Sequence, residues 1–152
     1  MEAYVIATAC TKFEKKADQT FKNLTEEVYC DLLKSAKVEN GNMIGQAWFG
    51  NCGMGTFGQN NIRGQVCFTP LVQKKLFPER VGIINVEGGC ATGSMAFHGA
   101  WKDVISGTED VSLAIGVEKI YQPNQPEKIQ EIYDGGIDQF LSLIHISEPT
   151  RH

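Results

Sequence analysis

The residue with the clearest chemical potential is Cys90, which stands in a short glycine-rich stretch. Gly88 and Gly89 precede it, and Gly93 follows three positions later. Because glycine adopts backbone angles that other residues avoid, this stretch predicts a sharp turn that lifts the cysteine side chain above its surroundings. A cysteine thiolate is a strong nucleophile for acyl transfer, so Cys90 is a candidate catalytic nucleophile. A small buried residue that fills space below a tight turn is the alternative interpretation.

A strand and a helix are expected to hold this turn. Residues 81–86 are apolar enough for a central strand of a sheet, and residues 92–106 predict the best helix of the chain. That helix has one apolar face, made of Phe97, Ala100, Trp101, Val104 and Ile105, and Gly107 can end it. Cys90 would then lie at the helix N-terminus, where the helix dipole favours thiolate over thiol. Free N–H groups there can stabilise an oxyanion.

The rest of the chain alternates between strand and helix signals. Further strands are expected at residues 3–10, 43–50 and 111–117, and further helices from about residue 20 to Lys37 and over residues 65–76. The alternation predicts an α/β fold with α-β-α layers and a mostly parallel, four-stranded sheet. Ligands bind such sheets at the carboxyl ends of the strands, where the turn with Cys90 would lie.

Two local patterns refine this prediction. Asp18, Thr20 or Asn23 can cap the first helix, and Asn23 with Glu26 has the spacing of a capping box. The loop over residues 50–64 is rich in glycine but lacks the Gly-Lys-[Ser/Thr] sequence of a phosphate-binding loop. We therefore do not predict nucleotide binding at this loop.

The composition narrows the classes of partner. The chain has 152 residues, and 14 Lys+Arg against 18 Asp+Glu give a net charge of −4, which disfavours a nucleic-acid surface. A hydrophobic content of 42% is typical of a folded globular domain, and no apolar run is long enough for a membrane helix. The five cysteines are odd in number and lack Cys-x-x-Cys spacing, which argues against a disulfide framework and a zinc site. We expect reduced thiols in the cytoplasm, no metal or bound cofactor, and no nucleic-acid or membrane partner.

Several segments together resemble one enzyme family. The sequence NVEGGCATGSMA at residues 85–96, followed by AIGVEK at residues 114–119, resembles the nucleophile segment of thiolases. YVIAT and TKF within residues 4–13, and GQN at residues 58–60, occupy similar positions in that family. The resemblance covers residues 3–140 and is closest to the branch that contains the thiolase part of sterol-carrier-protein-type enzymes.

The resemblance implies an acyl-CoA C-acyltransferase with a layered α-β-α fold, of which this chain would be the N-terminal half. Cys90 would accept an acyl group from a coenzyme A thioester, and a second acyl-CoA would attack that acyl-enzyme in a Claisen condensation. The reverse direction would cleave a 3-ketoacyl-CoA. Thiolases also carry a histidine in Gly-His-Pro and a second cysteine in Cys-x-Gly, and neither motif occurs in this sequence. We therefore expect the chain to be inactive by itself. A homodimer, with contacts from residues 50–64 and from the strand before Cys90, is also implied.

Two other functions stay open at the level of sequence. A ketoacyl synthase-like condensing enzyme would share the architecture and a cysteine at the same turn. A non-catalytic acyl-binding or scaffold subunit would have the same fold but would not catalyse acyl transfer. Acyl-chain specificity and reaction direction are not predicted by the sequence.

Secondary candidates have simpler structural interpretations. His98 lies one helical turn beyond Ser94 and is predicted to be a partly buried packing or interface residue, with a base near Cys90 as the alternative. Glu87 is predicted to support the turn or to lie in solvent, with action on a substrate proton as the alternative. The remaining cysteines are predicted to fill space in the core or at the surface. Trp48 and Trp101 are predicted to be core residues, with stacking on a ligand as the alternative.

The chain is divided into two parts by sequence. Residues 1–140 are assigned to the incomplete thiolase-like domain. Residues 141–152 resemble the translation of a sequencing adapter and are predicted to be a non-native tail, which is excluded from the fold.

Overall fold

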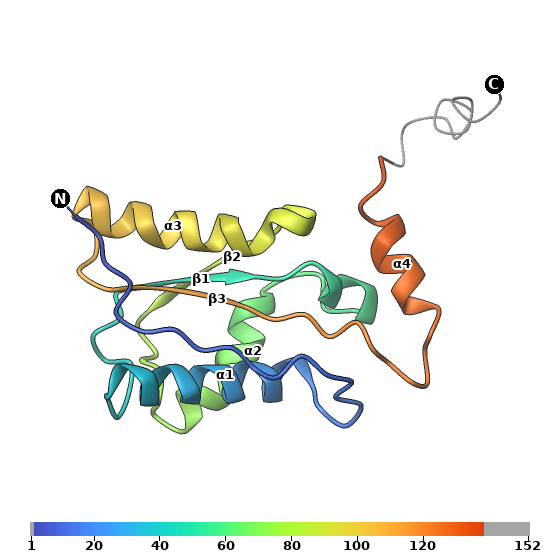
Figure 1. Ribbon diagram of the computed structural model, residues 1–152, viewed down its shortest axis with the longest axis horizontal. Coiled ribbons are helices and arrows are strands. Elements are labelled where there is room, and N and C mark those ends of the chain that lie inside the picture. Colours follow the sequence, from blue (N-terminus) through green and yellow to red (C-terminus); the bar gives the residue numbers. More distant parts are fainter. Residues whose placement is uncertain (1, 139–152) are drawn as a thin grey trace.

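The computed structural model describes residues 2–138, in which a three-stranded sheet lies between helices (Figure 1). The helices are α1 (Phe21–Ala36), α2 (Arg63–Gln73), α3 (Thr92–Ser106) and α4 (Lys128–Asp134), and the strands are β1 (Gln46–Gly50), β2 (Gly82–Val86) and β3 (Ser112–Gly116). Short 3₁₀ helices, η1 (Gly53–Phe57) and η2 (Gly89–Ala91), follow β1 and β2. The predicted helix over residues 92–106 is confirmed, as are strands within 43–50, 81–86 and 111–117. The predicted tail at 141–152 lies outside the described residues.

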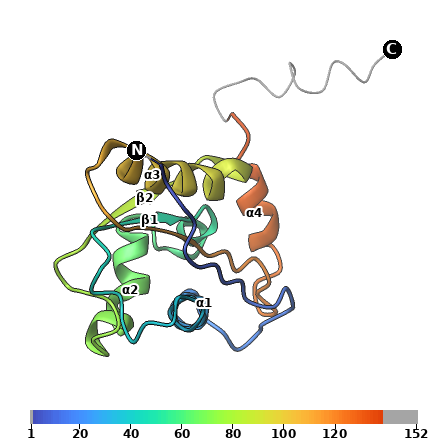
Figure 2. The same cartoon turned by 60° about the vertical axis from the view of Figure 1, so that its left-hand side comes forward.

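The sheet has the strand order β2-β1-β3, and both pairings are parallel. Helix α3 covers one face, and α1 and α2 cover the other (Figures 1 and 2). This arrangement confirms the predicted α/β fold with α-β-α layers and a parallel sheet. Since all strands point the same way, Gly50, Val86 and Gly116 stand side by side at one edge, where the three carboxyl ends meet.

The central strand is β1 rather than β2, so the prediction of a central strand at residues 81–86 is wrong. Ala47 and Phe49 of β1 are fully buried, whereas Ile84 of β2 is 39% exposed. An apolar run shows that a strand packs against a helix, here α2, but it does not identify the strand's neighbours in the sheet.

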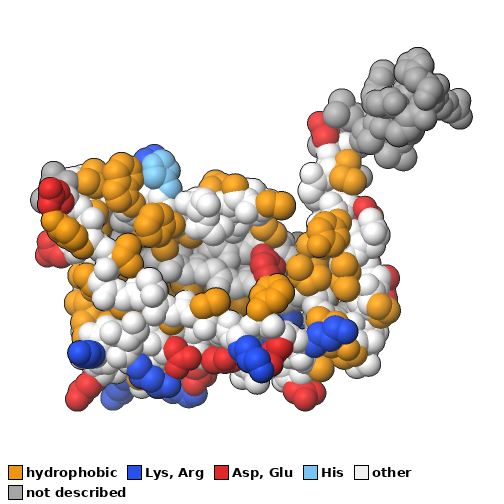
Figure 3. All heavy atoms as spheres, viewed as in Figure 1, with side chains coloured by type: hydrophobic (Ala, Val, Ile, Leu, Met, Phe, Trp, Pro, Cys, Tyr) orange, Lys and Arg blue, Asp and Glu red, His pale blue; other side chains and the backbone are white. Residues whose placement is uncertain are grey.

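The predicted strand over residues 3–10 is absent, which also corrects the expected four-stranded sheet. This segment has no regular secondary structure, and Tyr4, Val5 and Ile6 are 76%, 63% and 71% exposed. A strand forms by pairing, and no described strand pairs with this segment despite its β-prone residues. A hollow of about 380 Å³, lined mainly by apolar side chains of this segment, α1, α3 and β3, remains beside it (Figure 3).

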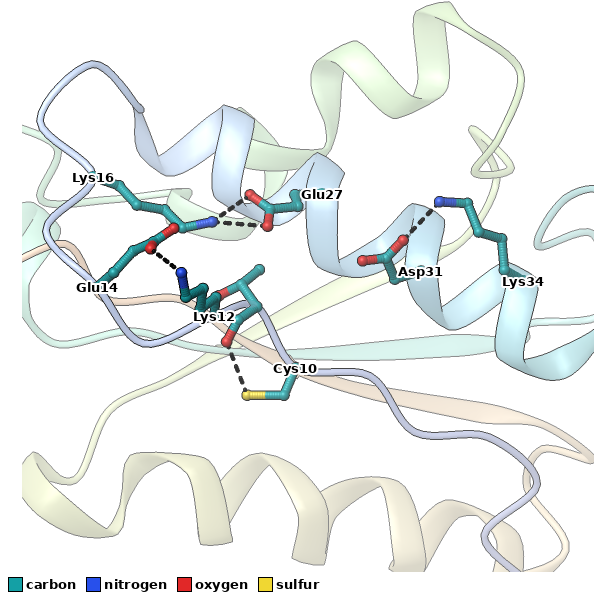
Figure 4. A network of polar contacts seen from close by, with 8 residues as sticks. Cys10, Lys12, Glu14, Lys16, Glu27, Asp31 and Lys34 are labelled. Carbon is teal, nitrogen blue, oxygen red and sulfur yellow. Dashed lines mark hydrogen bonds and ion pairs between the residues drawn. The ribbon is translucent and has the colours of Figure 1, made fainter.

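Ion pairs anchor the polypeptide that follows this segment. Lys16 binds Glu27 of α1 at 2.8 Å, and Lys12 binds Glu14 at 2.9 Å (Figure 4). The Lys16 side chain is only 13% exposed, because its stem lies against the protein surface. The Lys16–Glu27 pair therefore attaches the loop before α1 to that helix, whereas Tyr4, Val5 and Ile6 stay exposed.

Helix α1 begins at a capping box formed by Thr20 and Asn23, so the predicted pairing of Asn23 with Glu26 is wrong. The Asn23 N–H donates to Thr20 Oγ1 at 3.2 Å, and the Thr20 N–H donates to Asn23 Oδ1 at 3.1 Å. Thr20 has the extended backbone that a cap residue requires, whereas Asn23 already lies in the first turn. The Glu26 carboxylate instead pairs with Lys74, which follows α2. The helix ends at Lys37, as predicted, in a left-handed conformation.

Helix α3 packs on the sheet through small residues, which differs in part from the predicted face. Gly99 and Ala100 are buried, and a Cβ added at Gly99 would lie 2.3 Å from the Trp48 ring. Phe97 and Trp101 are 56% and 43% exposed, so the predicted apolar face lies only partly against the sheet, and the prediction that Trp101 is a core residue is wrong. The close approach of α3 to β1 requires a residue without a side chain, and the large apolar residues consequently lie at the side of the contact.

Two helices differ from the sequence prediction. Helix α2 begins at Arg63 and continues through Pro70, because a proline near the last turn loses only one helical hydrogen bond. Helix α4 was not predicted, since residues 121–138 are polar and contain two prolines. It packs on η1, where Ile132 approaches Gly53.

Candidate active site

Asn51 ties the three strand ends together at the carboxyl edge of the sheet. This residue directly follows β1 and is 1% exposed. Its N–H donates to the Val86 carbonyl at 3.3 Å, and its Nδ2 donates to the Val117 carbonyl at 2.6 Å. Its Oδ1 accepts from the Met54 N–H at 3.0 Å, and its own carbonyl accepts from Arg63 at 2.6 Å. The ends of β1, β2 and β3 are therefore fixed relative to one another.

Cys90 lies on a tight turn above this edge, between β2 and α3. The turn is the 3₁₀ helix η2, in which the Ala91 N–H donates to the Gly88 carbonyl at 3.0 Å. Gly89 has a φ of 56°, a left-handed conformation that favours glycine. The side chain of Cys90 is exposed, which contradicts the alternative of a buried space-filling residue. The sequence therefore correctly predicted the sharp turn at the start of the helix.

The hydroxyl of Thr92 braces this turn from below. Thr92 is 7% exposed, and its Oγ1 donates to the Gly89 carbonyl at 2.8 Å and accepts from the Gly88 N–H at 2.9 Å. Its methyl group faces β1, since a Cβ added at Gly50 would lie 3.0 Å from Thr92 Cγ2. The contact of its methyl group with β1 and the hydrogen bonds of its hydroxyl group together fix the orientation of the Thr92 side chain.

The thiol of Cys52 reaches the same turn from the loop after β1. Cys52 Sγ lies 3.2 Å from the Gly89 carbonyl oxygen and 2.9 Å from Thr92 Oγ1. The turn before Cys90 is therefore contacted by side chains from two different elements. Cys52 itself is partly buried.

Glu118, which follows β3, holds the loop that carries Cys52. Its carboxylate accepts hydrogen bonds from the backbone N–H groups of Cys52 and Gly53, the latter at 3.0 Å. Glu118 as a whole residue is exposed, but its carboxyl end lies against this loop through these hydrogen bonds. Burial at that end raises the pKa of Glu118, and the hydrogen bonds from Cys52 and Gly53 oppose the rise.

The secondary candidates lie apart from this arrangement. His98 is exposed, so the prediction that it is partly buried is wrong, although its ring stacks on Trp101 with the ring centroids 5.4 Å apart. Glu87 is exposed beside the turn. Trp48 is half-buried and donates from Nε1 to Asp103 at 2.7 Å.

The other cysteines differ mainly in their exposure. Cys67 is fully buried, with its Sγ 3.8 Å from Met54 Sδ, and burial raises the pKa of its thiol. Cys30 lies on α1 and is partly buried. Cys10 is exposed and was predicted to end a strand that does not form. These positions agree with the predicted space-filling roles of Cys30 and Cys67.

Within residues 2–138 the structure contains no group of three His, Cys, Asp or Glu side chains arranged to hold a metal ion. Among the same residues, no helix combines the length and the apolar character that crossing a bilayer requires.

Comparison with known proteins identifies the family. The family described as thiolase, N-terminal domain, matches residues 3–137. The chain belongs to the thiolase family. It is 32% identical over 117 residues to the benzoylsuccinyl-CoA thiolase subunit BbsB of Thauera aromatica. It is 31% identical over 117 residues to an acetyl-CoA acetyltransferase of Methanocaldococcus jannaschii, and 28% identical over 121 residues to one of Methanothermobacter thermautotrophicus. These matches cover 77%, 76% and 76% of this chain but only 28%, 28% and 29% of the relatives.

The sequence of this thiolase-family chain makes Cys90 a candidate nucleophile but does not predict the residues that contact its turn. Asn51, Cys52, Thr92 and Glu118 each lie within two residues of a strand end or of Cys90. The usable signal was their position, because polar side chains just beyond parallel strands gather at one edge of the sheet.

Proposed function

We propose that Cys90 is the acyl-accepting nucleophile of a thiolase and that the whole protein is an acyl-CoA C-acyltransferase. One observation carries this proposal: a chain of the thiolase family presents an exposed cysteine on a tight turn at the N-terminus of α3. Access to solvent allows a thioester to reach the sulfur. The Thr92 N–H donates to the Gly89 carbonyl, and the N–H groups that follow it in the first turn of α3 have no carbonyl partner within the helix and can face a developing negative charge.

The proposed reaction has two displacements at Cys90. The thiolate of Cys90 attacks the carbonyl carbon of an acyl-CoA, and the tetrahedral oxyanion collapses with loss of the coenzyme A thiolate, which takes up a proton. A second acyl-CoA that has lost an α-proton to a base then forms a carbon–carbon bond to the acyl group and expels Cys90. The product is a 3-ketoacyl-CoA, and the reverse sequence cleaves it.

This chain supplies the nucleophile for the first displacement only. Neither the Gly-His-Pro motif nor the Cys-x-Gly motif occurs in its sequence. We therefore propose that the described residues accept an acyl group in the context of the whole protein and do not complete the cycle alone. The names of the relatives favour a thiolase over a ketoacyl synthase. A scaffold role predicts an ordinary thiol at Cys90.

Alkylation of the 152-residue chain by iodoacetamide near neutral pH tests the proposal. Each cysteine falls in its own tryptic peptide, so mass spectrometry follows all five rates in one sample; the peptides are residues 1–12, 23–34, 38–63, 64–74 and 81–102. We expect Cys90 to react to completion well before Cys10, which is also exposed. A C90S variant should lose the fast phase, and C10S should keep it. Equal rates at Cys90 and Cys10 would contradict an activated nucleophile.

We also propose a homodimer and a cytoplasmic location. The resemblance to thiolases supports the dimer, and the exposed edge strand β2 with the loop at residues 50–64 offers the contact surface. The five unpaired thiols support a reducing compartment. Sedimentation of the chain tests the dimer, and a concentration-independent monomer would contradict it.

A further inference from the structure

The connection between β2 and α3 is braced by side chains that the reaction itself does not use. Thr92 bonds both neighbours of the turn, the Gly88 N–H and the Gly89 carbonyl, and Cys52 contacts the same carbonyl from the loop after β1. The Thr92–Cys52 contact joins positions 40 residues apart in sequence. The brace is therefore a tertiary feature and does not follow from the local glycine-rich sequence.

The Gly89 carbonyl is the point through which this brace acts on Cys90. The carbonyl of Gly89 and the N–H of Cys90 belong to one peptide group, which is planar and trans. In such a group the two bonds point in opposite directions. The Gly89 oxygen accepts from the Thr92 N–H, the Thr92 hydroxyl and the Cys52 thiol, and the last two are side-chain contacts. The Cys90 N–H is therefore directed to the opposite side, and the Cα–Cβ bond of Cys90 is fixed relative to the same plane.

The loop that carries Cys52 is itself held in place. The Glu118 carboxylate binds the N–H groups of Cys52 and Gly53, and Asn51 joins this loop to the ends of β2 and β3. Gly53 is buried between Glu118 and Ile132, and a Cβ there would lie 2.8 Å from Glu118 Oε2. The Cys52 thiol is thus presented to Gly89 by a restrained backbone.

We propose that Thr92 and Cys52 are positioning residues for Cys90, acting through the Gly89–Cys90 peptide group to hold the sulfur and the adjacent N–H in reactive geometry. This inference rests on the proposed nucleophilic role of Cys90. We expect Thr92 to contribute more than Cys52 to the reactivity of Cys90, because the Thr92 hydroxyl makes two hydrogen bonds to the turn and the residue is only 7% exposed. We expect Cys52 to contribute less to that reactivity, since a thiol is a weak hydrogen-bond donor.

The test compares matched substitutions that keep or remove the polar atom. T92V keeps the shape of the side chain and removes the hydroxyl, whereas T92S keeps the hydroxyl. C52A removes the donor, whereas C52S keeps one. The measured quantity is the rate of iodoacetamide alkylation of Cys90 across pH in the 152-residue chain. The rate at Cys10 serves as an internal reference, and protection of the buried Cys67 reports that the fold is intact.

We expect T92V to slow Cys90 alkylation about three- to tenfold at every pH, and C52A about two- to threefold, without change at Cys10. T92S and C52S should restore the rate to within about twofold, a rescue that a purely structural role does not predict. The double variant T92V/C52A should slow the reaction less than the product of the single effects, because both side chains act on one carbonyl.

The outcomes separate the two proposals. A fast Cys90 in the wild-type chain with unchanged rates in T92V and C52A would overturn the positioning role alone. A wild-type Cys90 no faster than Cys10 would overturn both proposals. If T92V exposes Cys67 to alkylation, the comparison of C52A with C52S decides, and equal rates in that pair would overturn the inference.

Discussion

The carboxyl edge of the sheet and the N-terminal segment at residues 3–9 are organised in opposite ways. At the edge, Asn51, Thr92 and Glu118 bring polar groups from three strand ends into contact, and no buried side-chain polar atom in residues 2–138 lacks a hydrogen-bond partner. In the N-terminal segment, Tyr4, Val5 and Ile6 are apolar and β-prone but largely exposed. Whether a segment is ordered into the fold therefore depends less on its residue types than on whether a neighbouring strand or polar group is available to pair with it. The following predictions test that contrast, from the largest expected effect to the smallest.

Replacing Asn51 should have the largest effect on stability. N51A leaves the buried Val117 carbonyl and Met54 N–H without their side-chain partner, which should lower the free energy of unfolding by about 2–4 kcal/mol. Urea unfolding followed by tryptophan fluorescence measures the change. The control N124A removes an exposed amide in a loop and should be nearly silent. Equal effects of the two substitutions would show that the edge is not held by Asn51.

Adding a methyl group at Gly99 should have an intermediate effect. The new Cβ would lie 2.3 Å from the Trp48 ring, so α3 must move away from β1, at a cost of about 1–3 kcal/mol. G93A provides the matched control in the same helix, because nothing lies within 4 Å of a Cβ at Gly93. Alanine there should be neutral or slightly stabilising, since it is the better helix former. The melting temperatures of both variants give the comparison, and a stable G99A would show that the close helix–sheet contact is dispensable.

The pH dependence of stability should report on Glu118. Its pKa is raised by burial in the folded chain, so the folded state binds the proton more tightly than the unfolded state. The stabilising contribution is therefore complete below the usual carboxyl pKa of 4.5 and is lost as the pH rises through the raised value. The stability of wild type relative to E118Q should fall across this window and then level off, as measured by urea unfolding at a series of pH values. A constant difference would contradict burial of the carboxyl group.

Substitutions in the N-terminal segment should have the smallest effect. I6S and V5S exchange largely exposed apolar side chains for polar ones, and each should change the free energy of unfolding by no more than about 0.5 kcal/mol. A loss above about 2 kcal/mol, of the kind that core truncation produces, would show that this segment is packed after all and would remove the contrast with the edge.

The parts of the fold that sequence predicted best are those whose signals are local. The helix over residues 92–106 has the predicted bounds, because the turn before it and Gly107 after it fix both ends within a few residues. Periodicity identified an apolar face on that helix but not which residues touch the sheet. Gly99 packs there and Phe97 does not, since the distance between helix and strand selects for the smaller residue.

The parts that sequence failed to predict depend on distant neighbours. Residues 3–10 carry strand residues without a pairing strand, and β2 is an edge strand despite its apolar sequence. The same limit applies to the site. The glycines next to Cys90 make it recognisable in the sequence as a candidate. The contacts of Asn51 with Val117 and of Cys52 with Glu118, in contrast, each span 66 residues of sequence. Folding alone brings these groups together.

The parallel arrangement of β1, β2 and β3 has a consequence for how such a protein can diverge. Each strand ends at the same edge of the sheet, so the connections that begin after Gly50, Val86 and Gly116 contact one another around the turn that carries Cys90. Ala47 and Phe49 are fully buried in the middle strand β1 and are not part of these connections. Mutations in one of these connections can therefore change the environment of the Cys90 turn while the sheet that supports it stays unchanged.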